Sequence, residues 1–138
     1  MRAYIFGGLV ASAMLLAVGP LAAHHSFSAE FDANKPITIT GTVTKVEWTN
    51  PHVWFYVNVK DPKTGEVTNW GAEMGPPHGL QRSGWRRETL KIGEEITVAG
   101  SMAKNGAKRM NASKVTLSST GGRPGQVLDA NSSQGQTP

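Results

Sequence analysis

The chain has 138 residues, of which 14 are Lys or Arg, 10 are Asp or Glu and none is Cys. This length suits one domain, and the lack of cysteine excludes disulfides, Cys-ligated zinc or iron–sulfur sites, c-type haem, blue copper and a lipid-modified cysteine anchor. Gly 16 and Pro 8 are too many turn-forming residues for a helical bundle, and a scattered net charge of +4 does not indicate nucleic-acid binding.

Residues 1–23 are typical of a secretory signal peptide. Arg2 precedes an uncharged apolar run from 4 to 18, and a Gly-Pro break and small residues follow. The run is shorter than the roughly 20 residues of a spanning helix, and an uncleaved anchor is the alternative. We therefore expect a periplasmic or secreted protein of a Gram-negative type bacterium that is not membrane-embedded after cleavage. Cleavage after Ala23 leaves His24 first, whereas cleavage after Ala22 leaves Ala23 first.

A polar leader at 24–35, which carries Phe27 and Phe31, precedes a single folded domain at 36–119. The domain is rich in β-branched residues with alternating polarity, the pattern of half-buried strands. Strands are expected at 37–48, 52–59, 67–74, 95–102 and 109–117, and a short helix at 79–85. The tail at 120–138 has few apolar residues and is predicted to be disordered.

The hydrophobic phase changes inside the first strand, which predicts a bulge near Gly41. The segments 61–65 (Asp-Pro-Lys-Thr-Gly) and 105–106 (Asn-Gly) are strong turn signals. Three meandering strands, a helix and a hairpin predict an all-β, mainly antiparallel fold. Its form would be a five-stranded OB-like Greek-key barrel with a short helical insert between strands three and four. A small β-sandwich is the competing fold.

Several short motifs resemble a family of small exported bacterial proteins of unknown function, the DUF 6152 family. The resemblance spans 24 to about 117 and implies a bacterial, periplasmic protein with an OB-like barrel. It brings no established activity and no site residues. The motifs are His24-His25-Ser26-Phe27, Glu30-Phe31-Asp32, Gly41-Thr42-Val43, Glu47-Trp48-Thr49-Asn50-Pro51-His52, Asn69-Trp70, Gly84-Trp85, Leu90-Lys91-Ile92-Gly93-Glu94 and Gly100.

The histidines indicate a copper site. His24 and His25 lie at the expected mature N-terminus, and His52 and His78 follow prolines at what should be one rim of the barrel. An N-terminal His offers its α-amine and imidazole to one metal, and nitrogen-rich tetragonal sites favour Cu(II). If Ala23 is first, the imidazole of His25 completes a square-planar site instead. The alternatives are that His24 and His25 only begin the polar segment after the signal peptide, and that His52 and His78 are ordinary strand-end and loop residues.

The outward face of the second strand indicates a different function. If Val53, Phe55 and Val57 face the core, Trp54 and Tyr56 face outward. OB-type barrels bind ligands on this surface, and an exposed aromatic face suits a glycan or an envelope protein. The alternative is that the leader covers this face with its two phenylalanines. The predicted ligand-binding set is Trp48, Asn50, Trp54, Tyr56 and Glu73.

No catalytic motif is present, so we expect a binding protein rather than an enzyme. The basic cluster of Arg82, Arg86, Arg87 and Lys91 is interpreted as a solvated surface, and export argues against a nucleic-acid partner. The leading hypothesis is a periplasmic protein that binds copper through its histidines. The second is a metal-independent module that binds an envelope protein, a glycan or another small ligand through the aromatic face.

Overall fold

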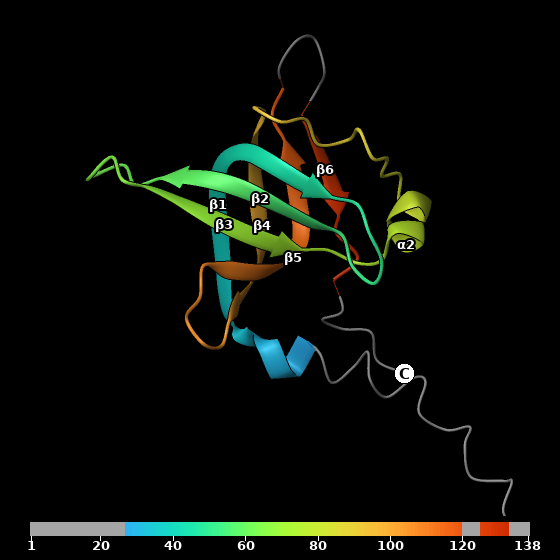
Figure 1. Cartoon of the computed structure of the whole chain (residues 1–138), viewed down its shortest axis with the longest axis horizontal. Helices are drawn as coiled ribbons and strands as arrows, with labels where there is room; N and C mark the ends of the chain where they lie inside the picture. Colours follow the sequence, from blue (N-terminus) through green and yellow to red (C-terminus); the bar gives the residue numbers. More distant parts are fainter. Residues whose placement is uncertain (1–26, 120–124, 133–138) are drawn as a thin grey trace, which may run out of the picture.

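The computed structural model describes residues 27–119 and 125–132 (Figure 1). Residues 27–30 form a helical turn, and helix α2 (Pro77–Arg82) lies between the third and fourth strands of the chain. No helix within the two described ranges is long and apolar enough to cross a membrane. The strands are β1 (Phe31–Glu47), β2 (Trp54–Lys60), β3 (Val67–Glu73), β4 (Glu95–Ala103), β5 (Arg109–Leu117) and β6 (Gln126–Asp129).

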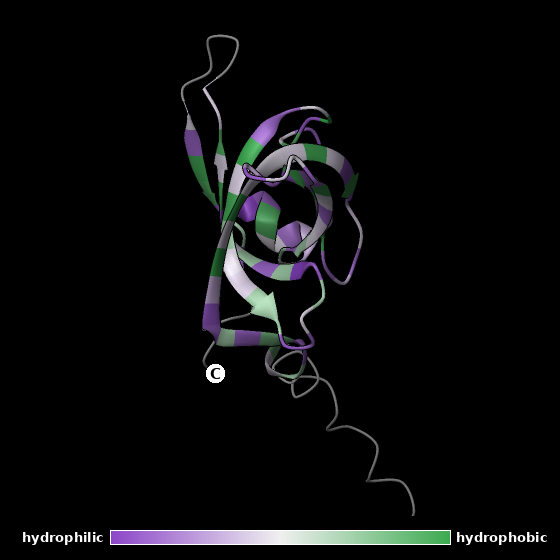
Figure 2. Cartoon of the chain, turned by 90° about the vertical axis from the view of Figure 1, so that its left-hand side faces the viewer, coloured by the Kyte–Doolittle hydropathy of each residue, from purple (hydrophilic) through white to green (hydrophobic). Residues whose placement is uncertain are grey.

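The strands form one sheet in the order β3-β2-β1-β4-β5-β6, in which all neighbours are antiparallel. A parallel pairing also joins 71–73 of β3 to 109–111 of β5. Each strand from β1 to β5 therefore has a neighbour on both sides, and Figure 2 shows these strands curving round to meet. The predicted mainly antiparallel all-β fold is confirmed. The described part of the chain contains six strands rather than the predicted five.

Strand β1 is long because it pairs with two different strands. Residues 31–42 pair with β4, and residues 42–47 pair with β2. The register shifts between Val43 and Lys45, which confirms the predicted bulge. A Cβ at Gly41 would meet the carbonyl oxygen of Asn58 at 2.3 Å, so the backbones of β1 and β2 approach closely only because this residue is glycine.

The first strand begins earlier than predicted, at Phe31 rather than at residue 37. A second register shift between Asp32 and Pro36 lets the chain pass a proline and still pair with β4. Part of the predicted leader is therefore strand, and its composition gave no sign of this because the segment is polar.

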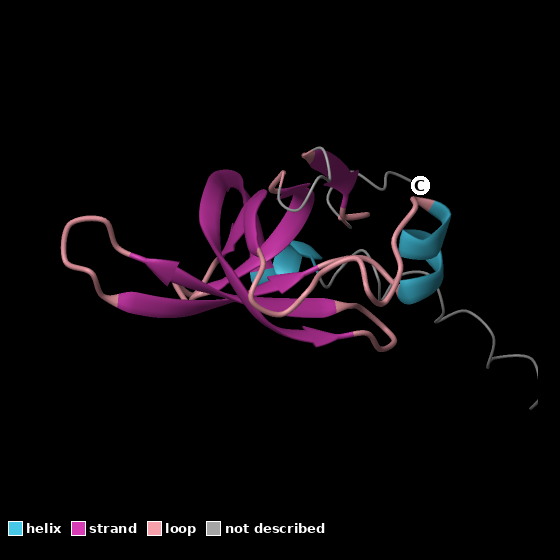
Figure 3. Cartoon of the chain, turned by 90° about the horizontal axis from the view of Figure 1, so that it is seen from above, coloured by secondary structure: helices cyan, strands magenta, loops and turns pink. Residues whose placement is uncertain are grey.

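The core lies inside the curved sheet, and the alternation of the strands fills it. Val53, Phe55 and Val57 are fully buried, as the pattern predicts. Burying a side chain of this size contributes roughly 1.5–3 kcal/mol. Helix α2 lies at the opposite end of the molecule from the β2–β3 turn (Figure 3) and buries Leu80 in the core. Trp85 follows it, fully buried, and donates its indole N–H to the carbonyl oxygen of Asp129 at 2.7 Å.

Both predicted turns are present. The Asp61 carboxylate accepts hydrogen bonds from the backbone N–H of Lys63 at 2.7 Å and of Thr64 at 3.0 Å, and Gly65 follows with φ 74°. Gly106 has φ 76° in the turn between β4 and β5. Glycine adopts this left-handed conformation without steric cost, which explains both turns.

The prediction of a disordered tail is wrong for 126–129, which form β6 and pair antiparallel with the edge of β5. Leu128 and Ala130 are buried in the core, and the Ala130 N–H donates to the carbonyl oxygen of Ser113 at 3.0 Å. Two apolar side chains and an available strand edge suffice to order this segment, although its composition is polar. Residues 120–124 and 133–138 of the predicted tail lie outside the described residues, as does the predicted signal peptide.

Candidate ligand-binding groove

Trp54 and Tyr56 lie on the outer face of β2, as the alternation predicts, and both are half-buried. The register pairs Tyr56 with Gly71 and Asn58 with Asn69 on β3. Residues paired directly across two strands project from the same face of the sheet. The outer faces of β2 and β3 therefore form one surface that combines aromatic rings and amides.

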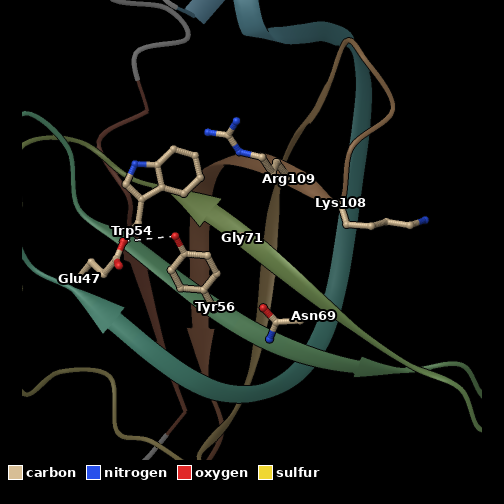
Figure 4. A pocket seen from close by; sticks show the side chains of 7 residues that line it. All are labelled: Glu47, Trp54, Tyr56, Asn69, Gly71, Lys108 and Arg109. Atoms are coloured by element: carbon tan, nitrogen blue, oxygen red, sulfur yellow. Dashed lines mark hydrogen bonds between the residues drawn. The ribbon is translucent and has the colours of Figure 1, made fainter.

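An open groove of about 460 Å³ crosses this surface (Figure 4). Its volume falls within the range of small-molecule sites, roughly 300–1,000 Å³. The β4–β5 turn and the first residue of β5 contribute one side of it, because the β3–β5 pairing brings this turn beside β3. We call it the aromatic groove, and its lining is Glu47, Trp54, Tyr56, Asn69, Gly71, Lys108 and Arg109.

Gly71 makes the groove possible because it adds no side chain between the two rings. A Cβ at this position would lie 3.2 Å from Cε1 of Tyr56 and 3.7 Å from Cζ3 of Trp54. The two rings therefore lean over the β3 backbone at this residue. Glycine inside a strand often marks a site where another group approaches the backbone closely.

Two cations border the groove. The Arg109 guanidinium lies 4.6 Å from the centroid of the Trp54 ring, and the Lys108 ammonium lies 5.2 Å from that of Trp70. A cation at this distance from a ring is attracted by its negative face. Trp54 thus holds the guanidinium of Arg109 at the groove, whereas the side chain of Lys108 points away from Arg109 (Figure 4) and lies near Trp70, a core residue.

The opposite side carries a small polar network. The Tyr56 hydroxyl donates to the Glu47 carboxylate at 3.2 Å, and the Lys45 ammonium lies 2.5 Å from the other oxygen of that carboxylate. The hydrogen bond and charge of Lys45 lower the pKa of Glu47, whereas burial and the nearby carboxylate raise the pKa of Tyr56. Next to this network, Asn69 donates to the side chains of Asn58 at 2.9 Å and Thr44 at 3.2 Å.

Glu73 lies on the predicted face but is buried, with 7 % of its surface exposed, and it does not line the groove. Its carboxylate lies 3.0 Å from Nδ1 of His52. Burial raises the pKa of Glu73 to about 7, the charge of Glu30 adds to the rise, and Arg109 opposes it. The prediction that Glu73 is open to ligands is wrong, because the end of β3 is covered.

Phe27 and Phe31 cover that end of the face. Their ring centroids are 5.8 Å apart, they are buried with Ala103, and Trp54 packs against the cluster. The alternative that the leader covers the aromatic face is therefore realised at Trp54. The groove beyond Trp54 stays open, with Tyr56 and Gly71 in its lining.

The structure places the remaining predicted ligand residues away from the groove. Trp48 follows β1 and is buried in the core, because the chain turns inward where the strand ends. Asn50 is exposed and precedes the cis peptide bond to Pro51. Trp48 is therefore a core residue rather than part of a ligand surface.

Two of the four predicted copper ligands, His52 and His78, lie in the described part of the chain. His52 is half-buried beside Glu73, and His78 is exposed on α2. No group of three or more His, Asp or Glu side chains within 27–119 and 125–132 is placed to hold a metal ion. His24 and His25 lie outside the described residues, so copper binding through them stays a prediction.

Sequence reasoning missed Gly71, Lys108 and Arg109 as parts of the site. The available signal was the Asn105-Gly106 turn, which was predicted and which presents the two cations immediately after it. Its position beside β3 depends on a parallel pairing between strands far apart in the chain, and no local pattern encodes such a pairing.

The chain belongs to the family of unknown function DUF6152, whose model matches residues 12–112. This confirms the resemblance found in the sequence, and the matched range contains every residue that lines the aromatic groove. A comparison with curated proteins found no match.

Proposed function

We propose that this protein is a metal-independent binding module that holds a saccharide in the aromatic groove. The observation that carries the proposal is the pair of rings leaning over Gly71 beside side chains rich in hydrogen-bonding groups. A pyranose has apolar C–H faces and a rim of hydroxyls, so it needs a flat ring surface bordered by donors and acceptors. Glu47, Asn69 and Arg109 offer those groups around Trp54 and Tyr56.

The strand pairing supports an OB-type barrel as the scaffold of this module. The meander from β1 to β3, the position of α2 before β4 and the β3–β5 pairing agree with that topology. OB-type barrels bind oligosaccharides and oligonucleotides on the face of strands two and three, between the first and fourth loops. The aromatic groove lies on that face, with Lys108 contributed by the β4–β5 turn.

The predicted signal peptide favours a saccharide over a nucleic acid as the ligand. Export would place the mature chain in the periplasm, or outside the cell, where glycans are abundant. The groove lining also contains three charged residues, whereas the core of a protein–protein interface is depleted of charged residues. An envelope glycan is therefore a better fit to this surface than a hydrophobic protein partner.

The test is saccharide binding by the purified mature chain, first on a glycan array and then by titration calorimetry with a chelator present. We expect Tyr56→Ala to weaken binding by about ten-fold or more, which corresponds to 1.4 kcal/mol. Ile92→Ala is the matched control, since this side chain is 66 % exposed and lies outside the groove lining. Failure to bind any glycan, or equal binding by the wild type and Tyr56→Ala, would exclude the proposal.

A further inference from the structure

We infer that the saccharide bound in the aromatic groove is acidic, and that Arg109 recognises its carboxylate while the charge of Lys108 strengthens the attraction from the same turn. This inference rests on the proposed function and specifies the class of ligand. It follows from how each cation is held, from the charges around it and from one carboxylate of the protein itself.

Arg109 is held at the edge of the groove by the ring of Trp54. Its guanidinium lies 4.6 Å from the centroid of the Trp54 ring, and its side chain is 49 % exposed. A guanidinium presents its donors as a rigid planar fork that matches a carboxylate, and packing against an aromatic ring fixes the plane of that fork. The contact with Trp54 therefore holds the guanidinium at the edge of the groove, and about half of the side chain stays accessible.

Lys108 supplies a second positive charge on the same turn, although its side chain points away from the guanidinium of Arg109 (Figure 4). Its ammonium lies near the ring of Trp70, and no carboxylate of the described residues lies within ion-pair distance of it. The acidic residue in the groove lining, Glu47, is on the other side and is paired with Lys45 at 2.5 Å. The charge next to the β4–β5 turn is therefore positive, which favours an anionic group on the part of the ligand that lies there.

Glu30 provides an internal carboxylate at the same guanidinium. Its Oε2 lies 3.9 Å from Nη2 of Arg109, a distance longer than a hydrogen bond. A separate hollow of about 160 Å³, lined by both residues, lies against the helical turn. Glu73 also faces Arg109, but its raised pKa keeps it partly protonated near neutral pH. Glu30 is thus placed as a weak competitor for the ligand carboxylate.

The experiment compares trigalacturonic acid with its methyl ester, which has the same rings without the charge. Both are titrated calorimetrically into the mature chain at pH 7.5 and low salt. We expect the acid to bind at least about ten-fold more tightly than the ester, because only the acid pairs with Arg109 and is attracted by the charge of Lys108. Arg109→Gln should remove most of this preference, and Lys108→Gln should reduce it by a smaller factor.

Two further variants sharpen the test. Glu30→Gln removes the competing carboxylate, so we expect the affinity for the acid to rise about three-fold and that for the ester to stay constant. Arg87→Gln is the charge-matched control, because Arg87 is exposed between α2 and β4 and does not line the groove. It should preserve the preference for the acid.

The outcomes separate this inference from the proposed function. Equal affinities for acid and ester, with both weakened by Tyr56→Ala, would overturn the acidic preference and leave saccharide binding standing. Equal losses in Arg87→Gln and Arg109→Gln would also overturn it, since the effect would then reflect net charge alone. If neither probe bound, the proposed function and this inference would fail together.

Discussion

The two faces of β2 differ in almost every physical respect although their residues alternate along one strand. The inner face consists of Val53, which directly precedes the strand, and of Phe55 and Val57 within it. All three side chains are apolar and fully buried. On the outer face, Trp54 and Tyr56 are half-buried and contact cations and a carboxylate. The inner face contributes stability through burial, whereas the outer face keeps aromatic surface and polar groups together at the solvent boundary.

The outer face also contains features that a stable fold does not need. Gly71 weakens β3 because glycine loses more conformational freedom on folding than other residues and packs no side chain. Glu73 is a buried carboxyl group with an unfavourably raised pKa. Departures from local rules of this kind concentrate at functional sites. The contrast between the faces therefore supports placing the function on the outer one.

The largest effect should come from the inner face. Phe55→Ala removes a fully buried ring and leaves a cavity, so we expect it to lower the free energy of unfolding by about 3–5 kcal/mol. Urea denaturation followed by circular dichroism measures this. Val127→Ala, at a side chain that is 62 % exposed on β6, is the control and should change stability by less than about 0.5 kcal/mol. A loss below 1 kcal/mol for Phe55→Ala would contradict the assignment of the inner face as core.

If the protein binds copper, the functional site lies in the leader rather than on the outer face of β2. If the mature chain begins at His24, that residue supplies an amine and an imidazole to the metal. We then expect a Kd for Cu(II) below about 1 μM, and we expect His24→Ala to weaken binding about 100-fold, or near 3 kcal/mol. Calorimetry on metal-free protein measures it, and His78→Ala shows whether the helix residue contributes. A mature chain that ignores added Cu(II) would exclude the copper hypothesis and leave the groove as the candidate site.

The buried carboxyl group at the end of the outer face predicts a pH dependence. The pKa of Glu73 is raised from 4.5 to about 7, so the folded state holds a proton that the unfolded state releases between these values. Its contribution to stability is complete below about pH 4.5 and is lost as the pH rises through 7. We expect a fall of about 2 kcal/mol across this range that Glu73→Gln abolishes.

Urea denaturation at a series of pH values measures that dependence, as the difference between wild type and Glu73→Gln. The difference is the informative quantity because His52, Glu30 and Arg109 also face this carboxyl group. Parallel pH profiles for the two proteins would show that Glu73 does not carry the effect.

The aromatic groove can be filled without disturbing the core. Gly71→Val places methyl groups where a Cβ would already lie 3.2 Å from the Tyr56 ring, so we expect saccharide affinity to fall about ten-fold, or 1.4 kcal/mol. Stability should change by less than about 1 kcal/mol, because valine favours strands and the ring has solvent to move into. Thr38→Val, on an exposed position of β1, is the control. Unchanged affinity in Gly71→Val would separate the groove from ligand binding.

Alternation predicted the inner face of the molecule well because its information is local. Trp70 and Ala72 of β3 and Met74 directly after it are buried as expected, and the predicted fifth strand coincides with β5 at 109–117. The errors fall where local composition and long-range contacts disagree. The segment 126–129 is polar but pairs with the edge of β5. Trp48 is buried in the core although it directly follows the last residue of β1.

The candidate site was predictable only in part for the same reason. Period-two alternation places Trp54 and Tyr56 outside. The role of Gly71 depends on its neighbours across β2, and Arg109 reaches the groove through the β3–β5 pairing. Both depend on register, which the hydrophobic pattern of a single strand does not specify. The outward face of a strand can therefore be predicted from that strand alone, whereas predicting a groove requires the arrangement of several strands.

The smallest effect distinguishes the ring of Tyr56 from its hydroxyl. Tyr56→Phe keeps the aromatic surface but removes the hydrogen bond to Glu47, whose carboxylate retains Lys45 as a partner. We expect stability to fall by about 0.5 kcal/mol and saccharide affinity to fall two- to three-fold, because a half-exposed hydrogen bond contributes little net free energy. Titration calorimetry and urea denaturation measure both quantities. If Tyr56→Phe weakened binding as much as Tyr56→Ala, hydrogen bonding rather than ring stacking would be the main contribution of this residue, and the outer face would act through its polar groups.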